Sequence, residues 1–499
     1  MVNLLNKITM KKLLLFIFTA SFGFAVQAQS FEIASGAVVT IGVGSSLSVG
    51  TAASSGVITN TSNTRLIIES TSAGSGSLIA GGTPNATVKR YVTTTRWNMV
   101  SPTTTGVTGQ TFFDASVNDS WLTYFDESVG TNGGDAGAGW EYLTTLSDAV
   151  NVGQGYNYYP SANETVEFAG NLQSADLSPT ITYTGSSKGF NLIGNPYPVA
   201  LYWDGTWTMS NVESTIWIWN GLTGQYQSQP GGLTTHYVPV GQGFFVRANA
   251  SSPTITIPAA KRAHNTQAFL KSSENVINND RLSINAQNNS YEDNIHICFG
   301  ANGSNEFDNG FDATKMFGLN EAPQLYIVEQ ELKQSYDYLP LLTEGENRTV
   351  AMSYIPGTSG QQQLIADFAY LQETHVTLED LQTSTTQNLN ENPVYVFNGT
   401  KDDDPDRFLL HFAWSPDGIA DELVQKTDVY IYSFEKDIYI QSKVNNQGEI
   451  TVCDMLGRTI YKNKYHNNME KIRLDINNSF VVVRVVTRQG VKSEKVYIR

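Results

Sequence analysis

Two stretches of the sequence repeat one another in order and in spacing. Three stations match between them: RWNMVSP (96–102) with GFNLIGNP (189–196), YFD (124–126) with IWN (218–220), and VGQG (152–155) with VGQG (240–243). The offsets are 93, 94 and 88 residues. Both stretches alternate aromatic and polar residues between Gly, Asn and Pro turns, which is typical of antiparallel strands. We therefore predict that residues 87–263 form a duplicated antiparallel β region.

Short β-type segments also fill most of the remaining chain. Residues 29–86 alternate apolar triplets with Gly, Ser and Asn turns, as the rungs of a β-solenoid require, and a flexible Ser/Gly linker is the alternative. Residues 281–413 contain short strands at a spacing that predicts a β-sandwich. Polar stretches at 264–280 and 414–427 are predicted linkers, and the second carries a short helical piece. The predicted fold class is all-β, built from tandem β modules.

Composition supports a folded, multi-domain chain. The 499 residues include 40% hydrophobic and 11% aromatic residues, which is enough for several packed cores and excludes wholesale disorder. A net charge of −16 disfavours nucleic acid and anionic membrane as partners. Two cysteines exclude a disulfide-stapled scaffold, and we expect Cys298 and Cys453 to be free thiols in strands.

The N-terminus has the pattern of a secretory signal peptide. Lys11 and Lys12 precede an apolar stretch that ends near Val26-Gln27-Ala28, and small residues at these positions suit cleavage after Ala28. The apolar run is too short to cross a bilayer comfortably, which takes about 20 residues. We predict a signal peptide at 1–28, export through the periplasm, and no transmembrane span in the mature chain.

The last part of the chain differs in charge from the rest. Residues 428–499 hold 12 Lys/Arg and 8 Asp/Glu, whereas the chain as a whole is acidic. The segment alternates apolar and polar residues in several strand-like runs. We therefore predict a separate basic β module at 428–499.

This tail resembles the type A C-terminal sorting domain of proteins exported by the type IX secretion system of Bacteroidetes. The resemblance rests on IYI (438–440), GEITV (448–452), the turn Asp454-Met455-Leu456-Gly457-Arg458, and the closing GVKSEKV (490–496). Cys453 and Ser479-Phe480 depart from the usual residues. The resemblance implies a small Ig-like β-sandwich, recognition by the type IX machinery, and removal of the tail or its exchange for a surface anchor. Motifs in the body are similar to lineage-specific secreted proteins of unknown function.

No motif in the sequence identifies a catalytic centre. The six histidines form no HExxH pair, and the two that lie in apolar strands are typical of hydrogen-bonded core residues. Residues 185–189 match G-x-S-x-G by letters, but a strand-like segment follows where a nucleophile elbow needs a helix. We predict no catalytic residues and a protein that is not an enzyme.

Acidic and aromatic clusters are the candidate binding residues. Four carboxylates crowd one short loop and form a candidate calcium site, with a solvated acidic turn as the alternative: Asp402, Asp403, Asp404 and Asp406. Aromatic residues crowd both copies of the duplication, and three tryptophans of the second copy are candidate carbohydrate-binding residues: Trp203, Trp217 and Trp219. The alternative is that these rings fill the core.

These observations predict a secreted or outer-surface protein without enzymatic activity, with a role in adhesion or surface structure. The alternative is a polysaccharide-binding or polysaccharide-degrading module. Expected partners are the type IX secretion machinery and, as candidates, a surface polysaccharide or another cell-surface protein. No cofactor is expected, with calcium as the one candidate.

Overall fold

A computed structural model gives the structure of the chain, which is nearly all β. It describes residues 8–10, 16–17, 23–26, 30–50, 56–114, 121–130, 138–186, 188–265, 275–276, 280–288, 290–329, 332–343, 346–369, 371, 374–414, 429–434, 436–442, 448–454, 458–465, 469–476, 479–487 and 490–498. Most of the predicted linker at 264–280, and all but the first residue of the one at 414–427, lie outside these ranges. In the described ranges the only α-helix is α1 (Gln110–Asp114), so no helix there could cross a membrane.

The N-terminal region is a β-solenoid, as predicted. Its described strands pair in parallel, one rung with the next: β4 (Ser30–Ile33) with β7 (Val57–Thr59), β5 (Val39–Ile41) with β8 (Leu66–Ile68), and β6 (Ser46–Val49) with β11 (Ser77–Ile79). Their apolar side chains fill one core. Three short strands pair in parallel with β4, β5 and β6: β1 (Ile8–Met10), β2 (Phe16–Ile17) and β3 (Gly23–Val26). They lie within the predicted signal peptide, which stays a prediction. A small hairpin joins β9 (Ser70–Thr71) and β10 (Gly74–Ser75).

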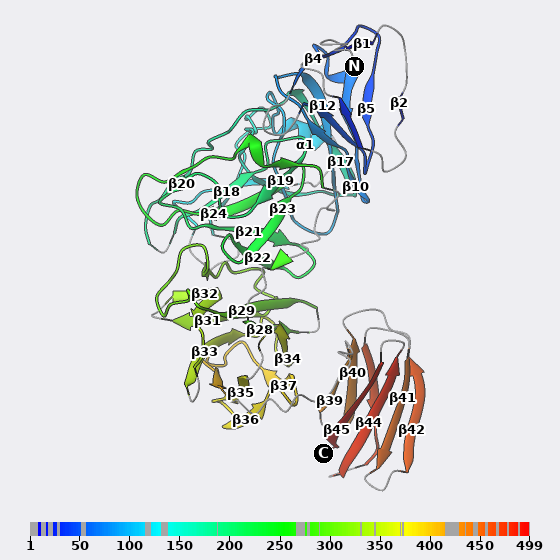
Figure 1. Cartoon of the computed structure of the whole chain (residues 1–499), viewed down its shortest axis with the longest axis vertical. Coiled ribbons are helices and arrows are strands. Elements are labelled where there is room, and N and C mark those ends of the chain that lie inside the picture. The colour runs from blue at the N-terminus through cyan, green and yellow to red at the C-terminus, as the bar shows by residue number, and fades with distance from the viewer. Residues whose placement is uncertain are drawn as a thin grey trace, which may run out of the picture.

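One long strand links the solenoid to the duplicated region. Strand β12 (Asn85–Val92) extends the solenoid sheet in parallel beside β8, and on its other side it pairs antiparallel with β17 (Glu164–Asn171). The side of β12 that carries Val88 and Val92 is buried. The solenoid therefore continues into the first copy of the duplicated region through a shared sheet (Figure 1).

The two copies of the duplicated region have the same sheet topology. In the first copy the order is β13 (Asn98–Val100), β16 (Tyr156–Tyr159), β14 (Trp121–Phe125), β15 (Trp140–Tyr142). In the second it is β18 (Phe190–Gly194), β24 (Gly243–Arg247), β21 (Thr215–Asn220), β22 (Gln225–Pro230). The duplication seen in the sequence is thus a duplication of a four-stranded antiparallel sheet.

A second layer of strands covers one side of the second copy. It contains β26 (Arg262–Ala263), β19 (Ala200–Trp203), β23 (Thr234–Val238) and β27 (Asn275–Val276). A short ladder of β20 (Met209–Ser210) and β25 (Thr254–Ile255) lies beside it. Trp203 and Trp207 pack in the core between these layers.

The repeated VGQG motif makes the contact between the two copies. Four main-chain contacts form two reciprocal pairs: bridges Val100–Gln242 and Gln154–Ile193, and hydrogen bonds of 3.0 Å from Ser101 N to Gly241 O and from Gly194 N to Gly153 O. Gly153 and Gly241 have φ angles of +80° and +62°, a region that glycine adopts without strain. The motif therefore repeats because each copy supplies the same turn to the other.

The third region folds one continuous sheet around a single core. Among the described residues this sheet has eleven strands: β28 (Asp280–Gln287), β29 (Glu292–Gly300), β30 (Ala313–Thr314), β31 (Gln324–Glu329), β32 (Leu332–Pro340), β33 (Asn347–Ile355), β34 (Gly360–Ala369), β35 (Thr374–Asp380), β36 (Thr385–Asn388), β37 (Val394–Gly399) and β38 (Phe408–Trp414). Residues from both halves of the sheet share the core. The sandwich is thus formed by a sheet that curls until its end strands approach each other.

The tail is a small β-sandwich of seven described strands, as predicted. One sheet contains β39 (Val429–Phe434), β40 (Asp437–Ser442) and β43 (Met469–Arg473), and the other contains β42 (Thr459–Tyr465), β41 (Gly448–Asp454), β44 (Ser479–Thr487) and β45 (Gly490–Ile498). The tail contacts the third region through Tyr432, which stacks on Tyr439 and donates a 2.7 Å hydrogen bond to Gln363. Figure 1 shows it beside the third region at the lower right.

Candidate functional site

The three tryptophans predicted to bind carbohydrate are buried. Trp203 and Trp217 are 0% exposed and Trp219 is 6% exposed. Their indole N–H groups donate to carbonyls inside the protein: Gln229 (2.9 Å), Thr314 (3.0 Å) and Trp97 (3.1 Å), respectively. Rings in this position cannot stack on a sugar, so the core-filling alternative fits them.

A segment of the third region covers the face of the second copy that contains Trp217. We call residues 309–323 the cap. Met316 of the cap packs in one core cluster with Trp217 and Phe245. Hydrogen bonds fix the cap at its edges, from Gln225 Nε2 to the carbonyl of Pro323 (2.6 Å) and from Leu319 N to the carbonyl of Gly224 (2.8 Å). Trp217 and Phe245 of the second copy are thus buried by a segment about 100 residues later in the chain together with Phe125 and Trp140 of the first copy.

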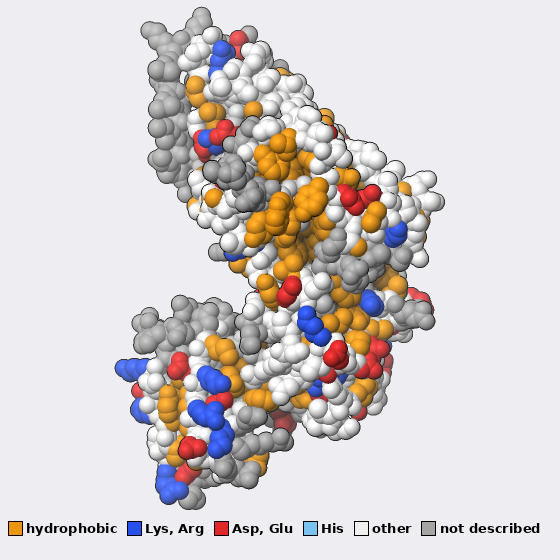
Figure 2. Space-filling view, turned by 180° about the vertical axis from the view of Figure 1, so that it is seen from behind, with side chains coloured by type: hydrophobic (Ala, Val, Ile, Leu, Met, Phe, Trp, Pro, Cys, Tyr) orange, Lys and Arg blue, Asp and Glu red, His pale blue; other side chains and the backbone are white. Residues whose placement is uncertain are grey.

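The equivalent face of the first copy is only partly exposed to solvent: its Phe125 packs on Phe245 of the second copy, with ring centroids 5.0 Å apart. Strand register makes the copies directly comparable, because Thr123 lies opposite Asn157 in the first copy as Trp217 lies opposite Phe245 in the second. We call the following residues the open face: Trp97, Trp121, Thr123, Tyr142, Asn157 and Tyr159. Trp121 is 49% and Tyr142 is 60% exposed, and both stand on the strands of this sheet. Figure 2 shows a broad hydrophobic area over the middle of the molecule on the side turned away in Figure 1.

Three rings of the open face touch each other. The ring centroids of Trp121 and Tyr159 are 5.6 Å apart with planes tilted by 34°, and those of Trp97 and Trp121 are 6.2 Å apart at 35°. Tyr159 meets Trp97 edge-on at 5.3 Å. Trp121 and Tyr159 are directly opposite on neighbouring strands, a pairing that stabilises a sheet and fixes both side chains. The three rings therefore form a single aromatic surface.

The centre of the open face is polar. Asn157 is 7% exposed, and its side-chain oxygen Oδ1 has no hydrogen-bond partner. Its neighbour Thr123 donates its hydroxyl to the main-chain carbonyl of Asn157 (3.4 Å) and leaves this side-chain oxygen unpaired. Buried acceptors are normally hydrogen-bonded, because an unpaired one costs about 1–3 kcal/mol. In the second copy the same two positions are Trp217 and Phe245.

Hydrogen bonds of the Asn98 side chain hold the turn that carries Trp97, and we call this set of hydrogen bonds the Asn bracket. Asn98 donates to the carbonyls of Thr93 and Arg96 (both 2.9 Å) and accepts from Thr93 N (3.2 Å). The bracket holds Thr95 in a left-handed conformation with a φ of +63°. Backbone strain of this kind persists only where the surrounding structure imposes it.

The second copy has the same bracket. Asn191 donates to the carbonyls of Thr182 (2.9 Å) and Gly189 (2.7 Å) and accepts from Thr182 N (2.8 Å). Asn98 and Asn191 occupy the same position in the first matched motif of the two copies. Each of them thus fixes the turn that carries an aromatic residue. That residue is Trp97 in the open face and the buried Phe190 in the second copy.

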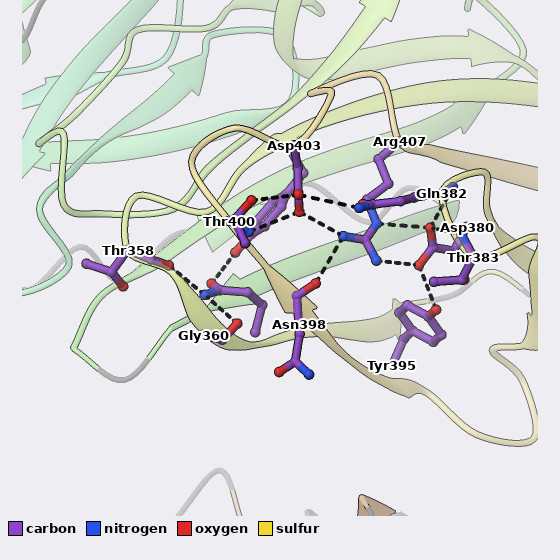
Figure 3. A network of polar contacts seen from close by, with 12 residues as sticks. Thr358, Gly360, Asp380, Gln382, Thr383, Tyr395, Asn398, Thr400, Asp403 and Arg407 are labelled. Atoms are coloured by element: carbon purple, nitrogen blue, oxygen red, sulfur yellow. Dashed lines mark hydrogen bonds and ion pairs between the residues drawn. The ribbon is translucent and has the colours of Figure 1, made fainter.

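The acidic loop of the third region is organised by an arginine (Figure 3). Arg407 makes a two-pronged ion pair with Asp380 (2.7 and 2.9 Å) and a longer one with Asp403 (3.3 Å). It also donates to the carbonyl of Asn398 (3.2 Å). Because Asp380 ends β35 and Asn398 lies on β37, this network joins the two ends of the curled sheet.

The predicted calcium ligands are therefore partly engaged within the protein. Partial burial opposes ionisation of Asp403, but hydrogen bonds from Thr400 outweigh it and keep the pKa of Asp403 below its usual value. Asp406 accepts a hydrogen bond from Ser353 (2.5 Å), and Asp402 and Asp404 are exposed. Among the described residues no three His, Cys, Asp or Glu side chains are grouped so as to hold a metal ion. Calcium binding stays a prediction.

Two residues of the predicted sorting motif close a turn. Arg458 pairs with Asp454 through its side chain (2.7 Å), and its main-chain N–H donates to the same carboxylate (2.9 Å). Met455, Leu456 and Gly457 lie outside the described residues. Neither cysteine is in a disulfide: Cys298 is buried and Cys453 is half-buried.

Two buried carboxyl groups, one within the cap and one on β32, have no signal in the sequence pattern. Burial raises the pKa of Asp312, within the cap, to about 7. Burial and the nearby Glu329 raise the pKa of Asp337, on β32, to about 8. The alternation of apolar and polar residues around Asp337 does not indicate that it is buried, because an Asp in such a strand is expected to face solvent.

Comparison with known proteins gives a partial match. A family described as a domain of unknown function (DUF8693) matches residues 205–412, which span most of the second copy and the third region. No curated protein matches the chain. Among solved structures, the BSP domain of a biofilm associated protein aligns at 8% identity over 82% of this chain and 91% of that chain, with a TM-score of 0.15. A TM-score this low carries no argument about this chain.

Proposed function

We propose that this chain is an exported protein without enzymatic activity that acts at the outer cell surface in adhesion or surface structure. The open face is the observation that supports this proposal most directly. It is an aromatic surface on paired strands, held by a side-chain bracket, and its Trp121 and Tyr142 are exposed where the counterpart face is capped. Side chains fixed in this way lose little conformational freedom when a partner binds.

Export forms the second part of the proposal and rests on the sequence. A signal peptide at 1–28 would take the chain to the periplasm, and the tail at 428–499 would direct it across the outer membrane by the type IX route. The Asp454–Arg458 ion pair is compatible with a structured turn at the motif that carries the resemblance. The tail would then be removed or exchanged for an anchor.

Polysaccharide binding is the second candidate function, and the open face is the specific observation that favours it. Aromatic faces stack on the apolar faces of sugar rings. The residues that would carry this function are Trp97, Trp121 and Tyr159 of the first copy, in place of the buried Trp203, Trp217 and Trp219. The open face supports binding and gives no support for degradation.

The test uses the native host and the full chain. Deleting residues 428–499 is expected to leave the protein in the periplasm, as measured by protease digestion of intact cells with a periplasmic protein as control. Normal surface display of the shortened chain would overturn the sorting assignment. A strain lacking the protein is expected to adhere less to surfaces or to neighbouring cells, and undiminished adherence would overturn the adhesive role.

A further inference from the structure

We propose that two copies of the mature chain, which lacks residues 1–28, pair head to head through the first rung of the solenoid. The first rung is the coil that contains β4, β5 and β6. This inference rests on the proposed export, because the edge of that rung is free only after the predicted signal peptide has been removed. It names one partner for the proposed surface function, a second copy of the same chain.

The two ends of the solenoid differ in what pairs with their strands. At the inner end β8 pairs with β12, and Leu78 of β11 donates its main-chain N–H to the carbonyl of Pro198 (2.8 Å). Ile58 of β7 donates in the same way to the carbonyl of Gly81 (3.2 Å). At the outer end β4, β5 and β6 pair with β1, β2 and β3, which all lie within residues 8–26. Removal of the signal peptide therefore frees one side of each strand of the first rung, whereas the inner end stays covered.

The freed edge carries little that would prevent pairing with another strand. Edge strands are templates for further pairing, and natural proteins block them with Lys or Pro. Strands β4, β5 and β6 contain no Lys, Arg or Pro, and Glu32 is their one charged residue. Phe31, Val39 and Ile41 of this rung belong to the apolar core of the solenoid, which would then end at an open rung. Because solenoids need a cap at such an end, we expect the edge to take up a partner.

Strand lengths favour a second copy of the first rung over a single extended peptide. Strands β4 and β6 have four residues each, and β5 between them has three. A two-fold axis through the middle of β5 places β5 against its own copy and β4 against β6 of the other chain, with each pair antiparallel. One peptide strand would pair with only one of the three. Since the two edges close each other, association stops at the dimer.

The middle residue of β5 directs its main-chain groups to the freed side. Successive residues of a strand point their N–H and carbonyl groups to opposite sides. The carbonyl of Ile41 accepts a 2.9 Å hydrogen bond from the N–H of Glu69, on the side of β8. The N–H and carbonyl of Thr40 therefore face the freed edge. Across the two-fold axis they can form a reciprocal pair of hydrogen bonds with Thr40 of the second copy.

The position of the edge suits contact between cells. Figure 1 shows the solenoid and the N-terminus at one end of the molecule and the tail toward the other end. The tail, or the anchor that replaces it, would thus hold the chain by the end opposite the first rung. Pairs formed between many chains on two facing cells raise the overall avidity of a weak single contact.

The experiment measures the association state of the exported protein purified from its host, once its intact mass has shown the loss of residues 1–28. Sedimentation equilibrium is expected to show monomers and dimers in equilibrium, whereas the chain that keeps residues 1–28, produced without export, is expected to stay monomeric. Thr40→Pro removes the central N–H from both copies and should weaken dimerisation at least about tenfold, since two hydrogen bonds are lost. The matched control is Thr40→Ala, which keeps the N–H and should dimerise as the unaltered chain does.

A charge exchange at the same position keeps the test decisive if Thr40→Pro disturbs the fold. The side chain of Thr40 is half-buried, whereas those of its neighbours in β5 lie in the core. The two Thr40 side chains lie opposite each other in the proposed dimer, so Thr40→Lys and Thr40→Glu should each weaken self-association by like-charge repulsion. An equimolar mixture of the two variants should restore the dimer.

Four results would overturn the inference. They are a monomer at all concentrations, equal dimerisation by the chain that keeps residues 1–28, association that no substitution at Thr40 alters, and growth beyond the dimer. The export proposal is scored separately. An exported protein that keeps residues 1–28 would overturn both proposals, whereas a processed protein that is displayed at the surface as a monomer would overturn the head-to-head pairing alone.

Discussion

The first and second copies of the duplicated region share their strand order, their Asn bracket and their reciprocal VGQG contacts, but one aromatic face is capped and the other is partly open. Trp217 lies under the cap, whereas Trp121 is half exposed on the corresponding sheet. The polar centre of the open face, Asn157, takes the place of Phe245. The comparison teaches that an aromatic cluster in a repeat is core or surface according to what a distant segment places over it.

The largest expected effect is a loss of folding stability that differs between the capped face and the open face. Trp217→Ala should lower the free energy of unfolding by about 3–5 kcal/mol, because it empties a closed core and leaves the carbonyl of Thr314 without its donor. Trp121→Ala should cost less than about 1 kcal/mol, since half of its ring is already in water. Urea unfolding of the full chain, followed by circular dichroism, measures both. Equal losses would break the distinction between a capped and an open face.

The next largest expected effect is a change in folding stability with pH, which arises from carboxyl groups within and beside the cap. The folded-state pKa values of Asp312 and Asp337, about 7 and about 8, lie above the roughly 4 expected in the unfolded chain. The folded state therefore holds protons that the unfolded state has lost. The contribution of these two groups to stability is largest below about pH 4, falls as the pH rises above that value, and levels off once the pH passes 7 to 8. We expect a loss on the order of 2 kcal/mol between pH 6 and pH 8.

Thermal melts at pH 6 and pH 8 test this pH dependence. Asp337→Asn removes one of the two titrating groups and should flatten the pH dependence, without any change in how the open face behaves. A melting temperature that is the same at both pH values would show that these carboxyl groups titrate normally.

The smallest expected effect is the loss of stability when a glycine at the junction between the two copies is replaced. An added Cβ at Gly153 would lie 2.2 Å from Leu177 Cδ2, whereas at Gly241 the nearest atom would be the carbonyl oxygen of Ser101 at 3.2 Å. Both residues have positive φ angles, so Ala is strained at either site. We expect losses of about 2 kcal/mol for Gly153→Ala and about 1 kcal/mol for Gly241→Ala in denaturant unfolding. A larger loss at Gly241 would contradict this ranking.

Local patterns in the sequence were sufficient to predict the β modules, the solenoid and the duplication. Each of these predictions depends on neighbouring residues, namely turn glycines, the alternation of apolar and polar residues, and short motifs that match between the copies. Gly153 and Gly241 of the VGQG motif adopt positive φ angles, which glycine allows without strain. What could not be predicted was that these turns bind reciprocally across the copies, because this depends on how the two sheets meet.

The assignment of binding residues failed for a physical reason of the same kind. Trp203, Trp217 and Trp219 stand among polar and glycine residues, so nothing nearby in the sequence shows that they are covered. The cover comes from residues 309–323, from the opposing strand layer and from the first copy, all of them outside the local sequence pattern. Exposure of Trp121 and Tyr142 is equally non-local. The acidic loop was recognised as a cluster, but its engagement with Arg407 depends on the curling of the sheet.

The reciprocal junction has a consequence for the origin of the molecule. A single copy of the unit carries both halves of the contact, the VGQG turn and the strand that receives it, so its edge is complementary to itself. Two separate identical chains could form the same junction as an isologous dimer. Joining the two in one polypeptide replaces an association that depends on concentration with one that does not. Once the partners were no longer identical, each face was free to diverge, so that one is covered by the cap and the other is partly exposed.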